Sequence, residues 1–330
     1  MNREKLLAAV ERVMPAVTES NLTEQNNLII FNKKEVVSYD NEILIISPIK
    51  VGIEGAVPAN ELLKLLTKIK DKKIEVNQKD KILEIKGGLT IAEFKITDIK
   101  IPPIERPTKW RTLPKDFIKG ITYCKSSVAS GTGNILNNIL LNKDKILSCD
   151  NYRVTEYTME REIFKKHYFI PSSVINTLLL FAPTYFSSNK QWLFFKNKDE
   201  EILCIKTPNI EFPDISSILD SKIKGVKIKL PSQLKESLER TKILSEEDIM
   251  TGNHILNITI KDNKLICSGE CAAGKIEETI KIKYKGEKIM FTIVPDFLFE
   301  VLDKTENILI GESALKFKTK KLQHRIQLIK

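Results

Sequence analysis

The stretches FNKKEVVSYDN (Phe31–Asn41) and LNKDKILSCDN (Leu141–Asn151) are two versions of one pattern, placed 110 residues apart. When they are aligned, an Asn, a Ser, an Asp and a second Asn coincide, with matching apolar pairs between them. A weaker third version, IKDNKLICSGE (Ile260–Glu270), again places a polar turn before alternating residues. The recurrence predicts an internal repeat, which has to be recognised before any other assignment of fold.

Two kinds of amphipathic helix recur with the same period. One kind follows an apolar residue and a proline, which suits a helix start because the first turn does not use the missing N–H. Its copies are Val57–Leu66, Ile170–Leu179 and Val294–Leu302. The other kind has apolar residues at helical spacing and lies roughly 57 to 64 residues before each of these prolines. Its copies are REKLLAAVERV (residues 3–13), LPKDFIKGITYC (113–124) and LPSQLKESLERTK (230–242).

The ends of the repeats set the predicted domain boundaries. Ile96–Ile104 and Lys206–Ile215 each run a strand into a proline and are followed by linker residues. Three domains are therefore predicted, at residues 1–108, 109–220 and 221–330. Segments such as LKFKT and LNITI alternate apolar with polar residues, which indicates strands with one buried face. We expect an α+β fold in which each domain packs two helices on antiparallel sheets.

Composition and charge restrict the class of protein. The 330 residues are 42% hydrophobic and 29% charged, without an apolar run of membrane-spanning length or a secretory signal, so a cytoplasmic protein is expected. The five cysteines are an odd number that fits a reducing compartment, and none stands at zinc-finger spacing, so no metal is expected. The net charge of +10 modestly favours a polyanionic partner.

The triplicated pattern resembles the bacterial DNA polymerase III beta subunit, the sliding clamp. The residues that carry the resemblance are the strand pair at 138–162, the FPDISSIL stretch (Phe212–Leu219) and the final hairpin and helix at 269–302. Asn151 and Tyr152 stand where the family has glycine and histidine, and RIQLIK replaces its usual C-terminal residues. These departures fit a divergent clamp, encoded by a phage, a mobile element or a fast-evolving bacterium.

The resemblance implies a non-catalytic ring, formed by two chains head to tail, whose helices surround duplex DNA. Such a ring holds DNA through basic side chains that meet phosphates without reading sequence. Lys64 and Lys68 stand four residues apart and form one cationic helix face opposite a leucine face. A lysine on an amphipathic helix can also simply keep that helix solvated. The candidate DNA-binding residues are Arg3, Lys5, Arg12, Lys64, Lys68, Lys115, Lys119, Lys235, Arg240 and Lys242.

The resemblance also implies an apolar cleft between the second and third domains. In the family this cleft receives short linear peptides of the polymerase, the clamp loader and other partners. An apolar pocket with a few polar groups suits such a weak, exchangeable anchor. Val154, Ile326 and Leu328 could also be ordinary core residues of strands. The candidates are Tyr152, Arg153, Val154, Leu219, Met250, Phe297, Ile326 and Leu328.

Other motifs carry little functional information. GECAAGK (Gly269–Lys275) has the spacing of a phosphate-binding loop, but Ile276 stands where Ser or Thr should follow, and the segment joins two predicted strands. Asp40 and Asp150 occupy equivalent places in different repeats and are read as turn residues. No catalytic residue or cofactor is expected. The alternative to a clamp is a monomeric nucleic-acid-binding protein, or an enzyme, on the same triplicated scaffold.

Overall fold

The computed structural model describes residues 1–18, 27–99, 103–129, 131, 135–208, 210–248 and 252–329. These residues form two compact units, which are described separately. The first unit comprises Met1–Ile118 and Ser173–Asn209, and the second comprises Lys119–Ser172 and Ile210–Lys330.

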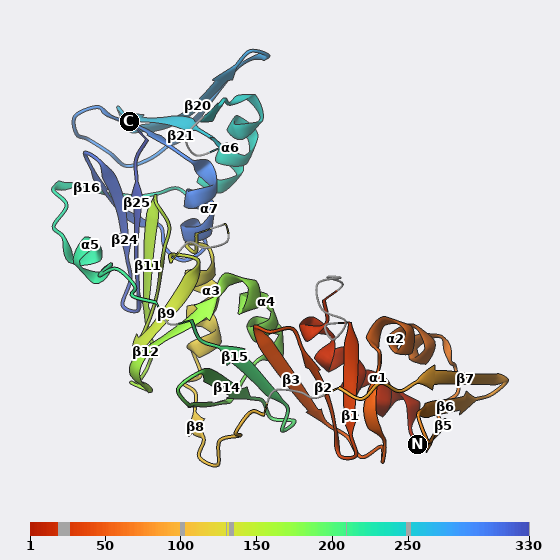
Figure 1. The fold of residues 1–330 in the computed structure, drawn as a ribbon. Coiled ribbons are helices and arrows are strands. Elements are labelled where there is room, and N and C mark those ends of the chain that lie inside the picture. The colour runs from red at the N-terminus through yellow and green to blue at the C-terminus, as the bar shows by residue number, and fades with distance from the viewer. Residues whose placement is uncertain are drawn as a thin grey trace. The chain divides into compact units, whose positions relative to one another are not determined.

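In the first unit, helices pack against antiparallel sheets (Figure 1). Its helices are α1 (Arg3–Val13), the 3-10 turn η1 (Met14–Ala16), α2 (Ala59–Lys68) and α4 (Ser172–Phe181). An eight-stranded sheet has the order β4 (Glu54–Pro58), β1 (Leu28–Asn32), β2 (Glu35–Tyr39), β3 (Ile43–Pro48), β15 (Ile202–Lys206), β14 (Trp192–Lys196), β13 (Tyr185–Ser188) and β8 (Arg111–Thr112). A second sheet contains β5 (Glu75–Lys79), β6 (Ile82–Gly87) and β7 (Thr90–Lys95).

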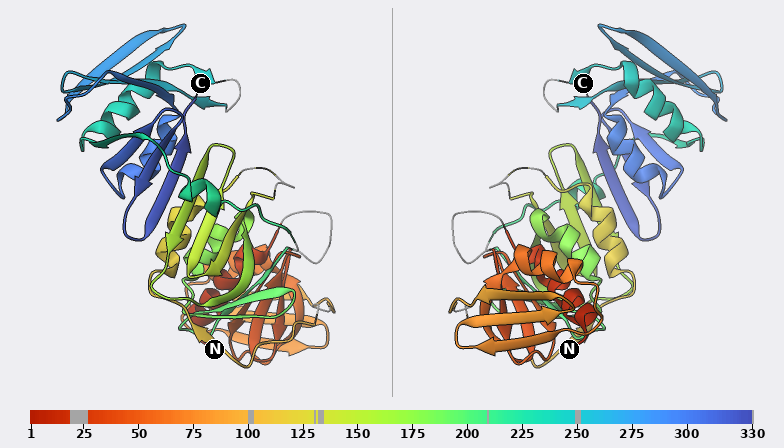
Figure 2. Two further views of the ribbon diagram at one scale, coloured as in Figure 1. Left: turned by 90° about the vertical axis from the view of Figure 1, so that its left-hand side faces the viewer. Right: turned by 90° about the vertical axis from the view of Figure 1, so that its right-hand side faces the viewer.

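The second unit repeats this design, with α6 and α7 lying side by side (Figure 2). Its helices are α3 (Phe117–Lys125), α5 (Ser216–Asp220), α6 (Leu234–Thr241), the 3-10 turn η2 (Lys242–Leu244) and α7 (Pro295–Leu302). Its eight-stranded sheet has the order β12 (Phe164–Pro171), β9 (Asn138–Lys143), β10 (Lys145–Cys149), β11 (Arg153–Thr158), β25 (Leu322–Gln327), β24 (Ala314–Lys318), β23 (Asn307–Gly311) and β16 (Gly225–Lys229). The smaller sheets contain β21 (Gly274–Lys281), β20 (Lys264–Cys271), β19 (Leu256–Lys261) and β22 (Ile289–Ile293), and separately β17 (Glu247–Asp248) and β18 (Asn253–His254).

The order helix, four strands, helix, three strands occurs three times along the chain. Strands β8 and β16 precede the second and third copies, α5 follows the second copy, and β17 and β18 are an insertion in the third. All six predicted helices are present, and the strand pairings are antiparallel, so the predicted α+β class is confirmed. Each eight-stranded sheet joins two copies of the repeat. The first junction pairs β3 with β15, and the second pairs β11 with β25. Because the sheets run across the predicted domain boundaries, the two compact units do not coincide with the three repeats, and the three-domain division stays a prediction.

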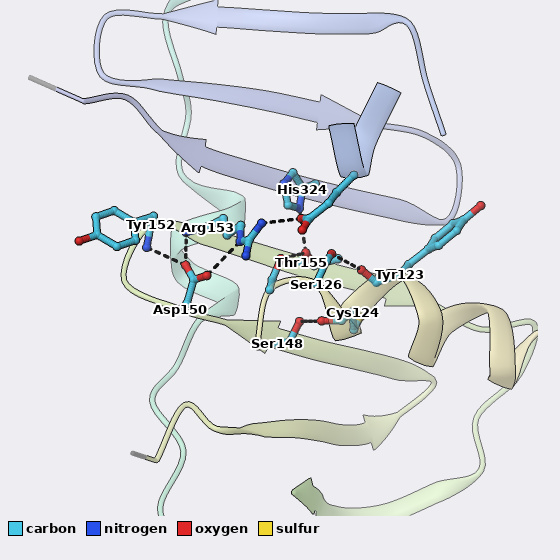
Figure 3. Close-up of polar contacts among 11 residues, drawn as sticks. Tyr123, Cys124, Ser126, Ser148, Asp150, Tyr152, Arg153, Thr155 and His324 are labelled. Atoms are coloured by element: carbon cyan, nitrogen blue, oxygen red, sulfur yellow. Dashed lines mark hydrogen bonds and ion pairs between the residues drawn. The ribbon is translucent and has the colours of Figure 1, made fainter. Parts of the chain in front are cut away.

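The two stretches with the same sequence pattern perform the same structural task. Ser38 donates a hydrogen bond of 2.5 Å to the carbonyl of Val13, and Ser148 donates one of 2.6 Å to the carbonyl of Cys124 (Figure 3). Each serine thereby satisfies a carbonyl at the end of a helix, which lacks a partner within that helix. Asp40 and Asp150 each accept backbone N–H bonds from the turn that follows. The repeated residues therefore fix the helix end and the turn.

The outer face of each eight-stranded sheet is covered by a predicted linker. In the first unit, Ile104 and Trp110 pack against an apolar cluster on β2, β3, β14 and β15. In the second unit, the segment after β15 contributes Phe212, Ile215 and Leu219 to a cluster with strands β9 to β12. The linkers thus bury apolar residues on the outer faces, so these strands are covered on both sides, whereas the alternating patterns predicted one buried face.

Candidate functional site

The first repeat presents exposed lysines on its helices. Lys64 and Lys68 are exposed on α2, while Leu62 and Leu66 on the same helix are buried. Lys5 is exposed on α1. Within the described part of the chain, none of these three lysines forms an ion pair. Their charge is therefore available to an external anion.

The two arginines of α1 are engaged inside the first unit. Arg3 donates from Nη1 to the carbonyl of Leu66 at 2.9 Å, at the end of α2. Arg12 places Nε 2.8 Å from Oε2 of Glu201, whose side chain is 10% exposed. Arg3 therefore supports the contact between α1 and α2, and Arg12 is neutralised by a largely buried carboxylate.

The lysines at the start of the second repeat differ in their surroundings. Lys115 is exposed in the turn before α3. Lys119 is exposed on α3, with Nζ 5.6 Å from the centre of the Tyr123 ring. Lys304 approaches the same ring at 4.5 Å, and burial lowers the pKa of its ammonium group. Tyr123 thus contacts two cations, of which only Lys119 is exposed.

The cations of the third repeat are paired with acids. Lys235 lies 3.0 Å from Asp303, Arg240 binds Glu278 through two hydrogen bonds, and Lys242 lies 2.8 Å from Asp296. Asp296 and Asp303 are two of the three acids of α7 and its end, together with Glu300. The structure shows that Asp296 and Asp303 neutralise two of the candidate cations.

A second group of candidates surrounds Arg153 at the start of β11 (Figure 3). Its Nε donates to Oδ2 of Asp150 at 2.9 Å, and its Nη1 donates to Oε2 of Glu300 at 2.5 Å. The guanidinium carbon lies 4.1 Å from the centre of the Phe297 ring, and Tyr152 stacks on that ring at 6.1 Å. Arg153 is held by two carboxylates and one aromatic face, which fixes a guanidinium group in a single orientation.

Burial shapes the electrostatics of this group. The Arg153 side chain is only 11% exposed. Removal from water raises the pKa of Glu300, and the neighbouring Arg153 charge opposes that rise. A partly buried carboxylate of this kind is stabilised by its cationic partner, because a charge that is partly removed from water without a partner is unfavourable. The Arg153–Glu300 contact therefore joins β11 to α7 within the second unit.

A buried polar chain lies beside Arg153. Ser127 and Thr155 exchange a hydrogen bond of 2.5 Å between hydroxyls, and Thr155 contacts Nδ1 of His324 at 2.8 Å. Nε2 of His324 has no hydrogen-bond partner among the described residues. Burial lowers the pKa of His324 to about 3, and the positive charges of Lys304 and Arg153 act in the same direction. His324 is therefore a neutral core residue near pH 7.

The structure divides the predicted cleft residues between two clusters. Tyr152, Phe297, Ile326 and Leu328 share the core beneath α6 and α7. Val154 and Leu219 belong to the cluster under α5, because neighbours along a strand point to opposite faces of the sheet. Met250 lies outside the described residues. The aliphatic candidates and Phe297 are buried in the second unit: Val154, Leu219, Phe297, Ile326 and Leu328.

Arg325 is a residue that the sequence did not single out. It lies opposite Val154 in the pairing of β11 with β25, and its Nη1 donates to the carbonyl of Ile218 at 2.8 Å and to the Ser221 hydroxyl. Lys316 donates to the carbonyl of Leu219. These cations satisfy carbonyls at the end of α5 and hold it on the sheet. In the sequence, these two residues stand out only as polar positions in alternating strand patterns. Such a pattern predicts which face a side chain lies on, but not which group it contacts.

Among the described residues, the features of a metal site, a membrane-spanning helix and a phosphate-binding loop are absent. In this described part of the chain, no group of three or more His, Cys, Asp or Glu side chains is arranged to hold a metal ion. None of the described helices has the length and apolar character needed to cross a membrane. The segment Gly269–Lys275 joins β20 to β21 through a tight turn, which excludes the strand-to-helix context of a phosphate-binding loop.

Comparison with solved structures identifies a class of protein with this fold. A beta sliding clamp of C. crescentus has a TM-score of 0.88 at 14% identity, over 100% of this chain and 98% of that one. The DNA polymerase III subunit beta of Pseudomonas aeruginosa has a TM-score of 0.86 at 16% identity, over 100% and 99% of the two chains. The DNA polymerase sliding clamp of Bacillus subtilis has a TM-score of 0.85 at 16% identity, over 100% and 98%.

No family model and no curated protein sequence matches the chain. The structural likeness nevertheless extends over the whole chain, so the protein has the fold of the DNA polymerase III beta subunit. The resemblance seen in the sequence is confirmed at the level of fold. The low identity fits a divergent chain with that fold.

Proposed function

We propose that the protein is a non-catalytic DNA sliding clamp, a ring of two chains that encircles duplex DNA. The solved structures that share its fold are named as sliding clamps and as beta subunits of DNA polymerase III. The ring would hold DNA replication proteins on the duplex in the cytoplasm. The observation that carries this proposal is a pair of edge strands, β7 and β21, whose counterparts in the other repeats pair with each other.

The three repeats allow three sheet junctions of the same kind. Two of them are formed within the chain, and the two strands of the third have no strand partner on their outer edge among the described residues. β3 pairs with β15 and β11 pairs with β25, which occupy corresponding places in their repeats. The next corresponding strands are β21 and β7, and each lies at the edge of its sheet. Unpaired edge strands are templates for pairing with another chain. Pairing β21 of one chain with β7 of a second copy, and the reverse, would close a two-chain ring.

The side chains at these edges support such pairing. Phe94 on β7 and Ile276 and Ile280 on β21 are only half-buried, whereas Ile45 and Leu203 at the first junction are buried. Ile91 on β7 is 67% exposed, and Leu89 in the preceding turn is fully exposed. A strand from a second copy would remove this apolar surface from water, which favours association.

The exposed lysines of the helices are the proposed contacts to DNA. Lys5, Lys64, Lys68, Lys115 and Lys119 remain candidates because their charge is exposed. Diffuse contacts of this kind attract the phosphate backbone without fixing one sequence or position. Arg3, Arg12 and the three cations of the third repeat would contribute less, because each already has a partner inside the protein.

The partner cleft stays a proposal in the second unit. Tyr152 and Arg153 are the partly accessible members of the group, beside buried apolar residues. A short peptide with an apolar anchor would match the aromatic surface of Tyr152, while the neighbouring Arg153 guanidinium is already held by Asp150 and Glu300. Such peptides would come from the polymerase and the clamp loader.

Ring closure is tested by retention on DNA of defined topology. Purified protein is loaded on nicked circular DNA, and its release is measured before and after the circle is cut. A closed ring stays on the circle and leaves the linear molecule by sliding off its ends. A monomer in sedimentation, binding circular and linear DNA alike, would support the alternative of a simple nucleic-acid-binding protein and reject the clamp.

The open junction and the DNA surface are tested with separate variants. Leu89→Glu with Ile91→Glu should convert the dimer to monomer and abolish retention, whereas Met290→Glu, an exposed residue on another strand, should not. Lys64→Glu with Lys68→Glu should reduce retention by tenfold or more and flatten its salt dependence by roughly two units of log–log slope. Lys261→Glu with Lys264→Glu, on an exposed hairpin, is the matched charge control. An unchanged Lys64/Lys68 variant would remove α2 from the DNA surface.

A further inference from the structure

A lysine-lined groove crosses the outer face of the second eight-stranded sheet. Its volume is about 870 Å3, and its walls are the chain that follows α5 and the strands β16, β23 and β24. In the strand register, Lys227 lies opposite Leu309 and Leu309 opposite Lys316, so one row places an apolar side chain between two lysines. The lysines of the groove are Lys222, Lys224, Lys227, Lys229, Lys316 and Lys318.

Acidic side chains do not balance this charge. Asp220 is the acid among the described residues that line the groove, and Lys229 is paired at 3.1 Å with Glu306. Lys222, Lys224 and Lys227 are exposed and form no ion pair among the described residues. Lys316 has its pKa lowered, first by burial and then by the nearby positive charges of Lys318 and Arg325. Like charges crowded in this way favour an external anion.

The corresponding place in the first sheet is closed. Lys196 and Lys318 occupy equivalent positions in the second and third repeats. Lys196 lies opposite Ile202 in the β14–β15 hairpin, and Lys318 lies opposite Gln323 in the β24–β25 hairpin. Lys196 is covered by the rings of Trp110 and Tyr185 at 5.2 and 5.0 Å, and it pairs with Glu200 at 2.9 Å. Lys318 is exposed and has no such ion pair among the described residues. The same position in the repeat is therefore covered by the chain itself in one sheet and left open in the other.

We propose that this groove binds an extended acidic peptide segment of a partner protein, with carboxylates on the lysine rows and apolar side chains on Leu309 and Ile223. The volume suits a short peptide, and the apolar side chains between the lysines suit alternating acidic and apolar residues. A phosphate backbone would use the lysines but would leave the apolar surface unmatched. Peptide is therefore favoured over nucleic acid, and the site is distinct from the proposed cleft around Arg153.

The proposal is tested with a fluorescent peptide of alternating Glu and Leu, whose binding to the full-length protein is measured by anisotropy. A Gln-for-Glu peptide and a single-stranded oligonucleotide of equal charge are the comparison probes. We expect the acidic peptide to bind at least tenfold more tightly than the neutral one, with affinity falling as salt rises. Lys227→Glu with Lys318→Glu should weaken binding at least tenfold, and Lys227→Gln with Lys318→Gln should have a smaller effect in the same direction.

Lys261→Glu with Lys264→Glu is the matched control, because it reverses the same number of charges on a hairpin outside the groove. This control should bind the peptide as the unmodified protein does. Thermal unfolding of each variant shows whether the fold is retained, which is expected because Lys227 and Lys318 are exposed. Equal binding by groove and control variants, failure of the acidic peptide to bind, or tighter groove-dependent binding of the oligonucleotide would overturn the proposal. Ring closure can fail without affecting this result, since the groove lies within one unit.

Discussion

The two sheet junctions have the same topology but different chemistry. At the first junction, the row across the strands is Ser38, Ile45 and Leu203. At the second junction, the corresponding row is Ser148, Thr155 and His324. The serine keeps its task of holding a helix end in both rows, while an apolar pair is replaced by a hydrogen-bonded polar pair.

This difference shows which residues the architecture requires and which it merely tolerates. The helix-end serine and the turn aspartate recur, because the same backbone groups need partners in each repeat. The side chains at the junction itself can be apolar or polar: Thr155 is bonded to Ser127 and to Nδ1 of His324, while Nε2 of His324 has no partner among the described residues. Replacing both members of a buried hydrogen-bonded pair by apolar groups of the same shape is generally close to neutral for stability. Stability alone therefore does not account for the polar second junction, which adjoins the proposed partner cleft.

The largest difference between the junctions should come from Arg153. Arg153→Ala leaves the partly buried Glu300 and Asp150 without Arg153 and should destabilise the second unit by about 2–3 kcal/mol. Urea unfolding, monitored by far-ultraviolet circular dichroism, would measure this loss of stability. The double variant Arg153→Ala with Glu300→Gln should recover part of it, because the charge of Glu300 is removed and only Asp150 is left without the Arg153 cation. A loss below about 1 kcal/mol for the single variant would show that the ion pair is unimportant.

The polar row can be converted into an apolar one. Thr155→Val alone removes the partner of both Ser127 and His324 and should cost about 1–3 kcal/mol. The triple variant Ser127→Ala, Thr155→Val and His324→Leu removes all three groups and should approach the stability of the unmodified protein. Thermal unfolding of both variants separates unsatisfied hydrogen bonding from loss of volume. A triple variant that is less stable than the single one would contradict this view.

The pH dependence of stability should also distinguish the two junctions. His324 has its folded-state pKa lowered to about 3 from 6.5, so the unfolded chain binds a proton that the native protein does not bind. Stability from this group is complete above pH 6.5 and falls by at most about 1.4 kcal/mol per pH unit as pH drops. Unfolding between pH 7 and pH 5 should show this slope, and the triple variant should lose it. Equal slopes in both proteins would exclude His324 as the cause.

The smallest effect is expected in the third repeat, where the corresponding row runs from Cys267 to Glu278 and ends at the open edge of β21. Glu278 binds Arg240, so Arg240→Ala should change DNA retention by no more than about twofold. Glu278→Gln should instead free the arginine and raise the salt dependence of retention by at most about 0.9 units of slope. Retention assays at several salt concentrations measure both. A tenfold loss for Arg240→Ala would place α6 among the main DNA contacts.

Much of the fold could be predicted from local sequence patterns. The helix of residues 3–13 and the polar turn at Asp262, within Ile260–Glu270, could be predicted because helical periodicity and turn chemistry act over a few residues. The arrangement of the candidate site could be predicted less well from the sequence. Val154 and Phe297 were grouped by the resemblance, but they lie in different apolar clusters because strand alternation sends Val154 to the other face.

By itself, the sequence determined the repeat, the helix and strand types, and the surplus of positive charge, since each depends on residues near one another in the chain. Only the tertiary structure decided which charges are free. Lys64 and Arg240 both lie on basic amphipathic helices, yet Lys64 is exposed and Arg240 is paired with a strand residue 38 positions away. Charge pairing is decided by distance in space, because the energy between two charges depends on their separation and on the surrounding solvent.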